Sequence, residues 1–413
     1  MRIGLGEPDH PVPLDSIELF DPAAYLRGSQ HGAWHTLRRQ APVRRERTPD
    51  GTDYWSFVSY ADCDRIIKDT ATFGSEHGTI LASVGVGDSA GGMAITLMDP
   101  PDHGQIRQPS MRRLRHAVVR NRTDDISARV LALADPLLTG GEHDVARLLR
   151  TLPMAAAGDL MGIPEEYWDT VAFNTTASIA PQDPEYAVGR NVEDTLRRVH
   201  HKLFAVFSEI IRSRRRNLGE DLISGLLTLE YHGRRMPEQQ VLMNCYSFAL
   251  GANSTTPHVA AQLLLTLAEQ PELWEAVLAD PSLVPALVDE GTRWVSPTHH
   301  LVRRVSKDTT LGGADLAEGD WVCAWVASAN RDENVFRDPY TFDLTRSPNP
   351  HMGFGVGPHY CIGAPASKVA LAALFGELAR RRIRFELAGE PTHLYSNWIN
   401  GITRLPMNFT TGA

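Results

Sequence analysis

A lone cysteine, Cys361, lies in a glycine-rich segment directly before an alanine-rich helical run, and this arrangement constrains the fold more than any other feature of the chain. Gly355 and Gly357 allow a tight backbone loop whose N–H groups can point at the sulfur. We expect Phe354 to cover the sulfur and keep water away from it. The positive end of the following helix dipole should lie near Cys361 and lower the pKa of its thiol. The segment therefore predicts a sheltered thiolate that can bind a metal.

The spacing Phe-Gly-x-Gly-x-His-x-Cys-x-Gly, from Phe354 to Gly363, fills every defining position of a known signature. It resembles the haem-binding signature of the cytochrome P450 family, in which a cysteine thiolate is the proximal ligand of the iron and promotes O–O cleavage. The alternative, a structural cysteine in a glycine-rich turn, would require a chance match at all of these positions. The resemblance implies haem b (iron protoporphyrin IX) as cofactor and Cys361 as the sole protein ligand of the iron. It places Phe354, Gly355 and Gly363 in the loop around that ligand.

Haem carries two propionates, and their burial requires cations or strong hydrogen-bond donors. The segment that begins at Asp99 resembles the family's Asp-Pro-Pro-x-His-x-x-x-Arg motif, which implies that His103 and Arg107 bind propionates. The resemblance extends to Arg303 and to His359, two residues before the cysteine. Each residue alone is compatible with a solvated surface cation. Together, at family positions, the four imply a propionate site.

The middle of the longest predicted helix departs from the family at one position. The family has Ala-Gly-x-Asp/Glu-Thr-Thr there, in which small residues leave a groove for oxygen while an acid and an alcohol relay protons. Gly251 and Ala252 retain the groove and Thr255 retains the alcohol, but Ser254 stands in place of the acid. Asn253 supplies a polar neighbour or holds an ordered water. This departure is compatible with hydroxylation through a water relay, with radical chemistry such as coupling or desaturation, or with a purely structural Ser254.

Glu290 and Arg293 are three residues apart, on one face of a helix expected to begin near Pro285. The pair resembles the family's Glu-x-x-Arg motif, which binds a downstream arginine and braces the cysteine loop. Arg346 is the best match for that arginine. The resemblance implies that these residues support the haem site and take no part in the chemistry.

Four arginines, Arg107, Arg112, Arg113 and Arg115, follow one another closely along the segment around Pro109. They form either a solvated helix face or a docking site for a small acidic ferredoxin, because charge runs alone do not decide between the two. The resemblance implies a ferredoxin and a ferredoxin reductase that pass on electrons from NAD(P)H.

Composition sets the remaining bounds. The chain has 413 residues, 42% of them hydrophobic and 22% charged, as in globular proteins with a substantial core. The net charge of −9 argues against nucleic acid as a partner. Three further cysteines (Cys63, Cys245, Cys323) are far apart, which favours reduced thiols in a cytoplasmic protein. We find no signal peptide, membrane span or internal linker, and we expect one domain over residues 1–413 with no membrane partner.

Helical periodicity dominates, so we expect a mainly α fold with a small β region, as in a single-domain cytochrome P450. The clearest helices are expected over residues 199–211, 237–270 and 364–381. The second of these would extend for about 50 Å and kink at Pro257, which lacks a backbone donor. Strands are expected over residues 43–47, 54–58, 309–311 and 321–327.

By family position, the substrate pocket is formed by segments 79–94, 246–255, 295–301 and 396–402. The apolar candidates there or beside them are Ile80, Leu81, Val84 and Ile95. The polar or aromatic candidates are His299, His300, Asn397, Trp398 and Asn400. This mixture favours a medium-sized natural product with polar groups over a steroid or a fatty acid. His299 and His300 either contact substrate or have a structural role.

The sequence thus predicts a haem-thiolate monooxygenase that hydroxylates a small-molecule natural product with O2 and electrons from ferredoxin. Oxidative C–C or C–N coupling of an aromatic or peptide-derived substrate is an alternative, suggested by Ser254. A haem-binding sensor or carrier is a second alternative, against which the retained Thr255 and oxygen groove argue.

Overall fold

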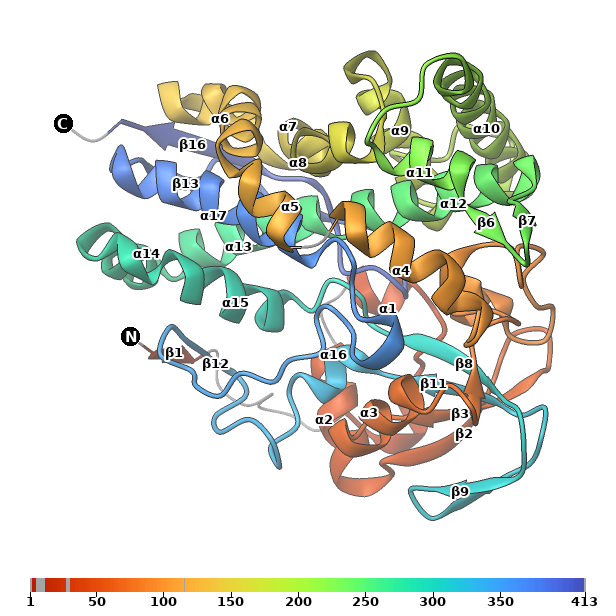
Figure 1. The fold of residues 1–413 in the computed structure, drawn as a ribbon. Coiled ribbons are helices and arrows are strands. Elements are labelled where there is room, and N and C mark those ends of the chain that lie inside the picture. Colours follow the sequence, from red (N-terminus) through yellow and green to blue (C-terminus); the bar gives the residue numbers. More distant parts are fainter. Residues whose placement is uncertain (1, 5–11, 27–29, 115, 412–413) are drawn as a thin grey trace.

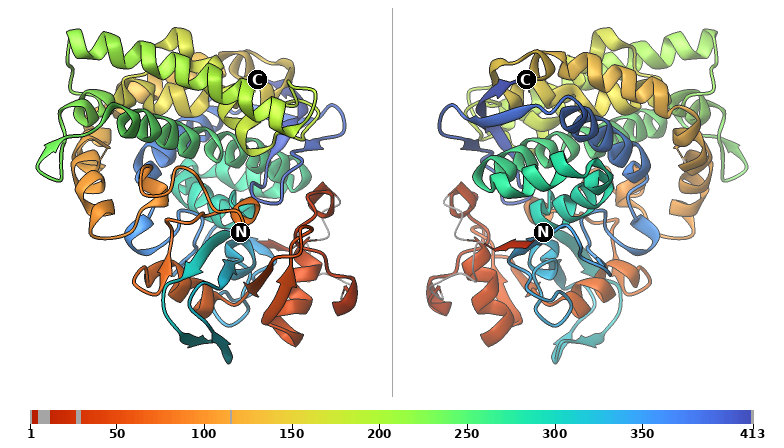
Figure 2. Two further views of the ribbon diagram at one scale, coloured as in Figure 1. Left: turned by 90° about the vertical axis from the view of Figure 1, so that its right-hand side faces the viewer. Right: turned by 90° about the vertical axis from the view of Figure 1, so that its left-hand side faces the viewer.

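The computed structural model describes residues 2–4, 12–26, 30–114 and 116–411 and divides into a helical part and a smaller sheet part (Figures 1 and 2). The helical part consists of α4 (Asp102–Leu114), α5 (His116–Asn121), α6 (Thr123–Thr139), α7 (Val145–Leu148), α8 (Leu152–Met161), α9 (Trp168–Ile179), α10 (Val192–Arg216), α11 (Leu222–Thr228), α12 (Glu238–Asn253), α13 (Thr256–Glu269), α14 (Pro271–Ala279), α15 (Val284–Val295) and α17 (Ala364–Arg380). The prediction of a mainly α fold with a small β region is confirmed.

A five-stranded sheet of order β2-β3-β11-β8-β4 forms the smaller part. Its strands are β2 (Val43–Arg47), β3 (Asp53–Phe57), β4 (Phe73–Gly74), β8 (Leu301–Val305) and β11 (Trp321–Ala324). Side chains alternate between its two faces, so Cys323 packs in the cluster with α2 (Gln30–Gln40), whereas Val322 packs in the cluster with α3 (Tyr60–Lys68). The short helices beside the sheet are α1 (Ala23–Leu26) and α16 (Val326–Ala329).

Smaller strand pairs complete the structure. They are β1 (Arg2–Gly4) with β12 (Thr341–Asp343), β6 (Glu230–Tyr231) with β7 (Arg234–Arg235), β9 (Thr309–Leu311) with β10 (Ala314–Leu316), and β14 (Thr392–His393) with β15 (Ile402–Arg404). A three-stranded sheet has the order β13 (Arg384–Leu387), β16 (Pro406–Thr410), β5 (Gly141–Asp144).

The four predicted strands are all present, although one is shorter than expected. The predictions for residues 43–47 and 309–311 match β2 and β9, and that for 54–58 matches β3 within one residue. The prediction for 321–327 is wrong at its end, because the chain leaves the sheet after Ala324 and forms α16. Trp325 is at this exit, where its indole N–H donates to the Ser56 hydroxyl (2.8 Å).

Two of the predicted helices are confirmed, since residues 199–211 lie within α10 and residues 364–381 coincide with α17. The third prediction, one kinked helix over residues 237–270, is wrong, because the segment forms two helices separated at Ser254 and Thr255. Pro257 has no N–H to donate to the carbonyl of Asn253, and it occupies the first turn of α13, where a proline is tolerated. The interruption therefore begins at Ser254, three residues before the kink predicted at Pro257.

The largest apolar cluster lies among α6, α8, α12, α13, α15 and α17. In Figure 1, α12 and α13 run in succession across the middle of the helical part. Cys245 and Cys323 are both buried in apolar clusters. None of the helices in the described ranges is long and apolar enough to span a membrane.

A buried carboxylate, Glu290 on α15, joins this core to the segment that precedes Cys361. Its oxygens accept bonds from Nε and Nη2 of Arg293 (2.8 and 2.7 Å) and from Nε of Arg346 (3.1 Å). The backbone N–H of Asp343 also donates to it (3.0 Å). The predicted association of Glu290, Arg293 and Arg346 is therefore confirmed. Glu290 and Arg293 are fully buried, so neither charge has access to water as a substitute partner.

We predict that Glu290→Gln lowers the free energy of unfolding by about 3–5 kcal/mol, because it leaves the buried charge of Arg293 without its counter-ion. Thermal and urea unfolding of the full chain measure this loss. The matched control is Glu275→Gln, which removes the partner of Arg384 in a half-exposed pair and should cost at most about 1 kcal/mol. Equal losses in the two variants would contradict a central role for Glu290.

Candidate active site

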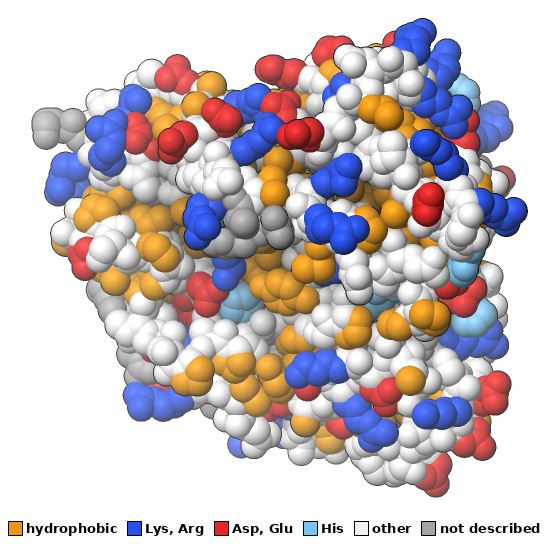
Figure 3. Space-filling view, viewed as in Figure 1, with side chains coloured by type: hydrophobic (Ala, Val, Ile, Leu, Met, Phe, Trp, Pro, Cys, Tyr) orange, Lys and Arg blue, Asp and Glu red, His pale blue; other side chains and the backbone are white. Residues whose placement is uncertain are grey.

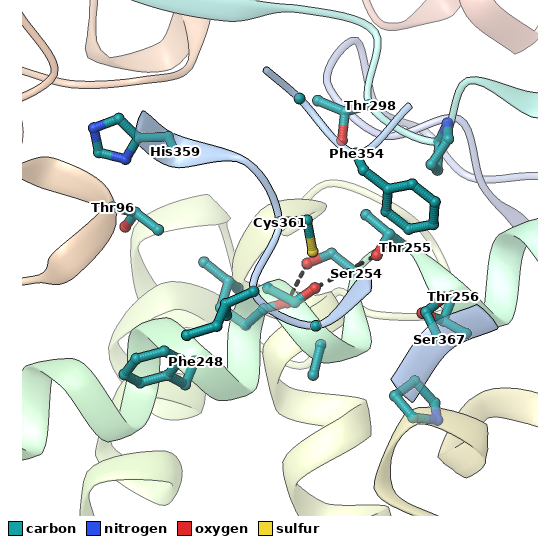
Figure 4. A pocket seen from close by; sticks show the side chains of 18 of the residues that line it. Thr96, Phe248, Ser254, Thr255, Thr256, Thr298, Phe354, His359, Cys361 and Ser367 are labelled. Carbon is teal, nitrogen blue, oxygen red and sulfur yellow. Dashed lines mark hydrogen bonds between the residues drawn. The ribbon is translucent and has the colours of Figure 1, made fainter. Parts of the chain in front are cut away.

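A cavity of about 330 Å³ lies where the interruption between α12 and α13 faces the cysteine loop. Its walls come from α4, α8, the start of α17, the start of β8 and the turn at Trp398–Ile399. Most of the lining side chains are apolar. Cys361, Ser254 and Thr255 all line this cavity, and Figure 4 shows their side chains together with others of the lining.

The cysteine loop has the tight backbone that its glycines predict. Gly355 and Gly357 both have positive φ (66° and 68°), a conformation that other residues rarely adopt. The N–H of Cys361 donates to the carbonyl of Phe354 (2.8 Å), which closes the loop just before α17. Gly363 is the residue directly before α17, and its φ is negative. Phe354 lines the cavity beside Cys361, as expected of a residue that covers the sulfur (Figure 4).

The expectation that the thiol pKa of Cys361 is lowered is wrong in its net direction, although the N–H groups at the start of α17 do lower it. Burial is the largest influence and raises this pKa, and it outweighs the backbone N–H groups of Gly363 and Ala364 and the positive charge of Arg107. These groups oppose the effect of burial without overcoming it. A metal cation deprotonates a thiol that binds it, so the thiolate at this site depends on a metal more than on the dipole.

Two arginines and two histidines from three parts of the chain lie along one edge of the cavity. His103 and Arg107 come from α4, Arg303 from β8 and His359 from the cysteine loop, and all four line the cavity. The rings of His103 and His359 are 4.2 Å apart between centroids. Arg107 donates from Nη2 to the carbonyl of Tyr360. The structure therefore brings together the four residues that the sequence predicts as a propionate site.

His103 and Arg303 are buried, and the polar atoms at this edge have few partners within the protein. Nε2 of His103, Nε2 of His359 and Nε of Arg303 have no hydrogen-bond partner within the described part of the chain. Burial lowers the pKa of His103 to about 4 and that of Arg303 to about 10. The carboxylate of Asp99 lies 3.9 Å from Nε2 of His359, too far for a direct hydrogen bond.

Unpaired buried donors of this kind are expected where a ligand supplies the acceptors. Two carboxylates at this edge would pair with His103, Arg107, Arg303 and His359, while Cys361 would provide a sulfur ligand from the adjacent wall. The residues therefore fit a haem, because its propionates need cations or hydrogen-bond donors and its iron needs a protein ligand such as the sulfur.

At the interruption between α12 and α13, the alcohols lie against the backbone. Ser254 donates from Oγ to the carbonyl of Leu250, and Thr255 donates from Oγ1 to the carbonyl of Gly251 (3.4 Å, Figure 4). A Cβ atom placed on Gly251 would meet no atom within 4 Å, so the backbone faces open space there. Ala252 lines the same stretch of the cavity. These four residues thus lie as the family motif implies.

Asn253 is placed differently from the expected polar neighbour of the relay. Its Nδ2 donates to the carbonyl of Ala249 (2.8 Å), and the residue is buried and lies outside the cavity lining. The next hydroxyl, Thr256 Oγ1, lies 3.0 Å from Ser367 Oγ on α17. Thr256 therefore contacts the helix that follows Cys361.

Of the two alternatives for His299 and His300, the structure favours the structural role. His299 and His300 are buried, and Nδ1 of each lies 3.1–3.2 Å from the carbonyl of Asn397. The N–H of Leu81 donates to Nε2 of His300 (3.1 Å), so the proton of this imidazole is on Nδ1. Burial lowers the pKa of His299 to about 4 and that of His300 to about 3, which keeps both rings neutral.

The amide side chains of the C-terminal segment follow the same pattern. Asn397 donates to the carbonyl of Phe20 and Asn400 to the carbonyl of Val295, both at 2.6 Å, and both lie outside the cavity lining. Leu81 and Val84 also belong elsewhere, in the apolar cluster beside the five-stranded sheet. Of the individually named candidates, Ile95 and Trp398 do line the cavity. The predicted segments also contribute Thr79, Pro297, Thr298, Leu301 and Ile399 to the lining.

Several wall residues escaped the sequence analysis. Pro153, Ala156, Ala157 and Met161 on α8 line the cavity. The signal for their burial was available, because α8 is apolar around most of its circumference, as a helix inside a protein core is. Their contact with the cavity depends on the packing of α8 against α12 and could not be read from the sequence.

The predicted basic face is not one surface. Arg107 points into the cavity, and Arg113 packs on Gly225 of α11 and donates to the carbonyl of Asp221 (3.0 Å). Arg112 is exposed, and Arg115 lies outside the described residues. Figure 3 shows scattered cations over α4 and a denser group of cations at the upper right, over α10 and α11.

Comparisons with known proteins agree with this site. The sequence model of the family "Cytochrome P450" matches residues 173–394. Linalool 8-monooxygenase of Pseudomonas putida is 30% identical over 95% of this chain and 98% of its own length. Methyl-branched lipid omega-hydroxylase of Mycobacterium bovis is 30% identical over 98% of this chain and 97% of its own.

Solved structures show the same similarity. A cytochrome P450 of Mycobacterium marinum in complex with pseudoionone superposes with a TM-score of 0.88 at 28% identity, over 96% of this chain and 99% of that one. A P450 involved in the biosynthesis of vancomycin-type antibiotics superposes with a TM-score of 0.85 at 28% identity, over 96% and 100% of the two chains. The chain therefore belongs to the cytochrome P450 family, whose relatives named above include a monooxygenase and a hydroxylase.

Proposed function

We propose that this cytochrome P450 inserts oxygen from O2 into a compact, mainly apolar substrate, with electrons supplied by a ferredoxin and its NAD(P)H-dependent reductase. The observation that carries the proposal is the cavity shared by Cys361, the two arginines and two histidines at its edge, and the open backbone at Gly251. A bound haem would supply the chemistry of oxygen activation, in which a thiolate ligand favours O–O cleavage.

The protein's own residues would position that group and control access to it. His103, Arg107, Arg303 and His359 would hold the propionates, while Phe354 would limit contact between water and the sulfur. Thr255 is the alcohol nearest the open backbone at Gly251, and its hydroxyl can pass a proton from an ordered water toward the reacting oxygen. Ser254 is bound to the backbone carbonyl of Leu250 and provides no acid.

The cavity lining favours an apolar substrate over the polar natural product suggested by the sequence. The histidines and asparagines behind that suggestion bind the backbone and lie outside the lining. Phe248, Ile95 and Leu301 are among the side chains that do line the cavity. Linalool and methyl-branched lipids, which the names of two relatives specify, are consistent with this composition.

Oxidative coupling remains a second candidate, because Ser254 replaces the acid of the usual relay. A P450 of vancomycin-type antibiotic biosynthesis is also among the structural neighbours. Hydroxylation is favoured because the mainly apolar cavity offers few groups that could orient a peptide-derived substrate.

We predict that the reduced holoprotein with carbon monoxide shows the red-shifted Soret band of thiolate ligation, and that Cys361→Ser abolishes this band. A serine oxygen cannot donate electron density to iron as a thiolate does. Cys323→Ser, in the core of the sheet part, is the control and should keep the band. If Cys361→Ser retains the band, the proposed ligand is wrong.

We predict that Thr255→Ala uncouples the enzyme, raising peroxide release per NAD(P)H several-fold and reducing product to a similar extent. Without an acid at Ser254, the proton route depends on this hydroxyl and on ordered water. Thr255→Ser retains the hydroxyl and should remain coupled. Unchanged coupling in Thr255→Ala would exclude Thr255 as the relay and make a polar group on the substrate the better candidate.

Electron delivery is predicted to depend on Arg112, the arginine of α4 that the structure leaves exposed. Arg112→Glu should slow ferredoxin-driven turnover several-fold, with a smaller effect at high salt because exposed charges are screened beyond about 10 Å at 0.1 M. Peroxide-driven turnover should stay within about two-fold of the parent, because it needs no docked carrier. The control, Arg216→Glu, makes the same charge change at the exposed end of α10 and should have little effect in either assay. Equal losses in both assays for Arg112→Glu would indicate damage to the fold and contradict docking at this arginine.

A further inference from the structure

Two small hydroxyl side chains form an isolated polar contact on the cavity wall. Thr96 Oγ1 and Ser247 Oγ lie 3.0 Å apart, and both residues line the cavity. Thr96 belongs to the single turn Ile95–Leu97, and Ser247 to α12. Figure 4 shows Thr96 on the wall of this pocket, on the same side as Phe248.

The position of this pair is fixed by a neighbouring residue. Asn244, fully buried one turn earlier on α12, accepts from the N–H of Ile95 and donates to the carbonyl of Met93, both at 2.9 Å. It also donates to the carbonyl of Gln240 within its own helix (2.8 Å). Asn244 therefore fastens the Met93–Thr96 segment to α12, and this attachment does not depend on the bond between the two hydroxyls.

The two hydroxyls can form more hydrogen bonds than the one between them. Two hydroxyls carry two donors and four acceptor lone pairs, and their mutual bond uses one of each. Among the described residues, Thr96 and Ser247 have no other side-chain hydrogen bond. Either hydroxyl can be the donor in the mutual bond. Ser247 is only 5% exposed whereas Thr96 is exposed, and both residues line the cavity, so the remaining O–H is available to an acceptor there.

We propose that Thr96 and Ser247 form a binding site for one oxygen function, a hydroxyl or a carbonyl, on an otherwise apolar substrate. This inference rests on the proposed function and narrows its substrate class. A hydroxyl pair can both donate and accept, so it suits an alcohol and a ketone alike. It carries no charge to hold a carboxylate.

The pair also has a defined relation to the site of reaction. Ser247 precedes Gly251 by four residues on α12, which corresponds to about 6 Å along a helix. A substrate whose oxygen is bound at Ser247 therefore extends toward the open backbone at Gly251. The carbon that lies there is about one helical turn away from the bound oxygen. Thr96 and Ser247 are thus positioning residues that set which carbon is oxidised.

The test uses three ligands that share one carbon skeleton: p-menthane, menthol and menthone. Binding to the holoprotein is measured by the spin-state shift of the Soret band. We expect the parent protein to bind menthol and menthone roughly 3- to 10-fold more tightly than p-menthane, as one neutral hydrogen bond allows. In Thr96→Val and in Ser247→Ala, the ratio of the affinities for menthol or menthone to the affinity for p-menthane should fall close to one. The affinity for p-menthane itself should not change. Menthol turnover by these variants should give a broader distribution of oxidised positions.

The control variant is Thr266→Val on α13, which removes a buried hydroxyl bound to the carbonyl of Gln262, outside the cavity. It should retain the preference. If the parent binds all three ligands equally, or if Thr96→Val and Ser247→Ala keep the preference, the proposed site is wrong. A uniform loss of affinity for all three ligands would mean that the pair only fastens the loop, and would also overturn it. Failure of the parent to bind any of them would overturn the apolar substrate class together with the pair.

Discussion

The placement of the cysteine loop depends on one buried carboxylate. Glu290 holds Arg293 and Arg346 through charge-assisted bonds, and it also accepts from Nδ2 of Asn349 (3.2 Å), just ahead of the loop. Arg293 in turn donates to the carbonyl of Asn330, whose side chain accepts from the N–H of Met352 at the start of the loop (2.7 Å). A buried charge without its partner is strongly unfavourable. These contacts therefore favour a single arrangement of the segment that leads to Cys361.

At the edge of the cavity, by contrast, buried polar side chains lack partners within the protein. His103 and Arg303 are buried at this edge, and their desolvation is only partly offset by Asp99. The oxygens of Glu290 all have donors, whereas Nε2 of His103, Nε of Arg303 and Nε2 of His359 have no hydrogen-bond partner among the described residues. Local inconsistency of this kind is expected at functional sites, because binding of the ligand removes it. The unpaired polar atoms of His103, Arg303 and His359 thus point to a ligand that supplies hydrogen-bond partners at this edge, independently of the cysteine signature.

The sequence predicted those features in which residue identity forces the local backbone. Gly355 and Gly357 adopt the positive φ that a tight loop needs, and Pro257 interrupts the long helix because it lacks a donor. Predictions failed where the outcome depends on which side of an element meets the core. Arg107 and Arg113 are turned toward the protein, and only tertiary packing distinguishes them from Arg112. The pKa of Cys361 depends on depth of burial, a quantity that no spacing of residues conveys.

Tertiary structure also explains why polar residues near the pocket that were candidates for substrate contact do not line the cavity. His299, Asn397 and Asn400 lie in segments without regular secondary structure, where backbone carbonyls lack partners from a helix or a sheet and must find side-chain donors. Long polar side chains in such segments therefore form hydrogen bonds with the backbone and are not available to bind a substrate. Small hydroxyl side chains held beside a regular helix, as at Ser247, remain able to contact the cavity. Polar contacts to the substrate should accordingly be sought on α12 and on the turn fastened to it, rather than among the more conspicuous histidines and asparagines.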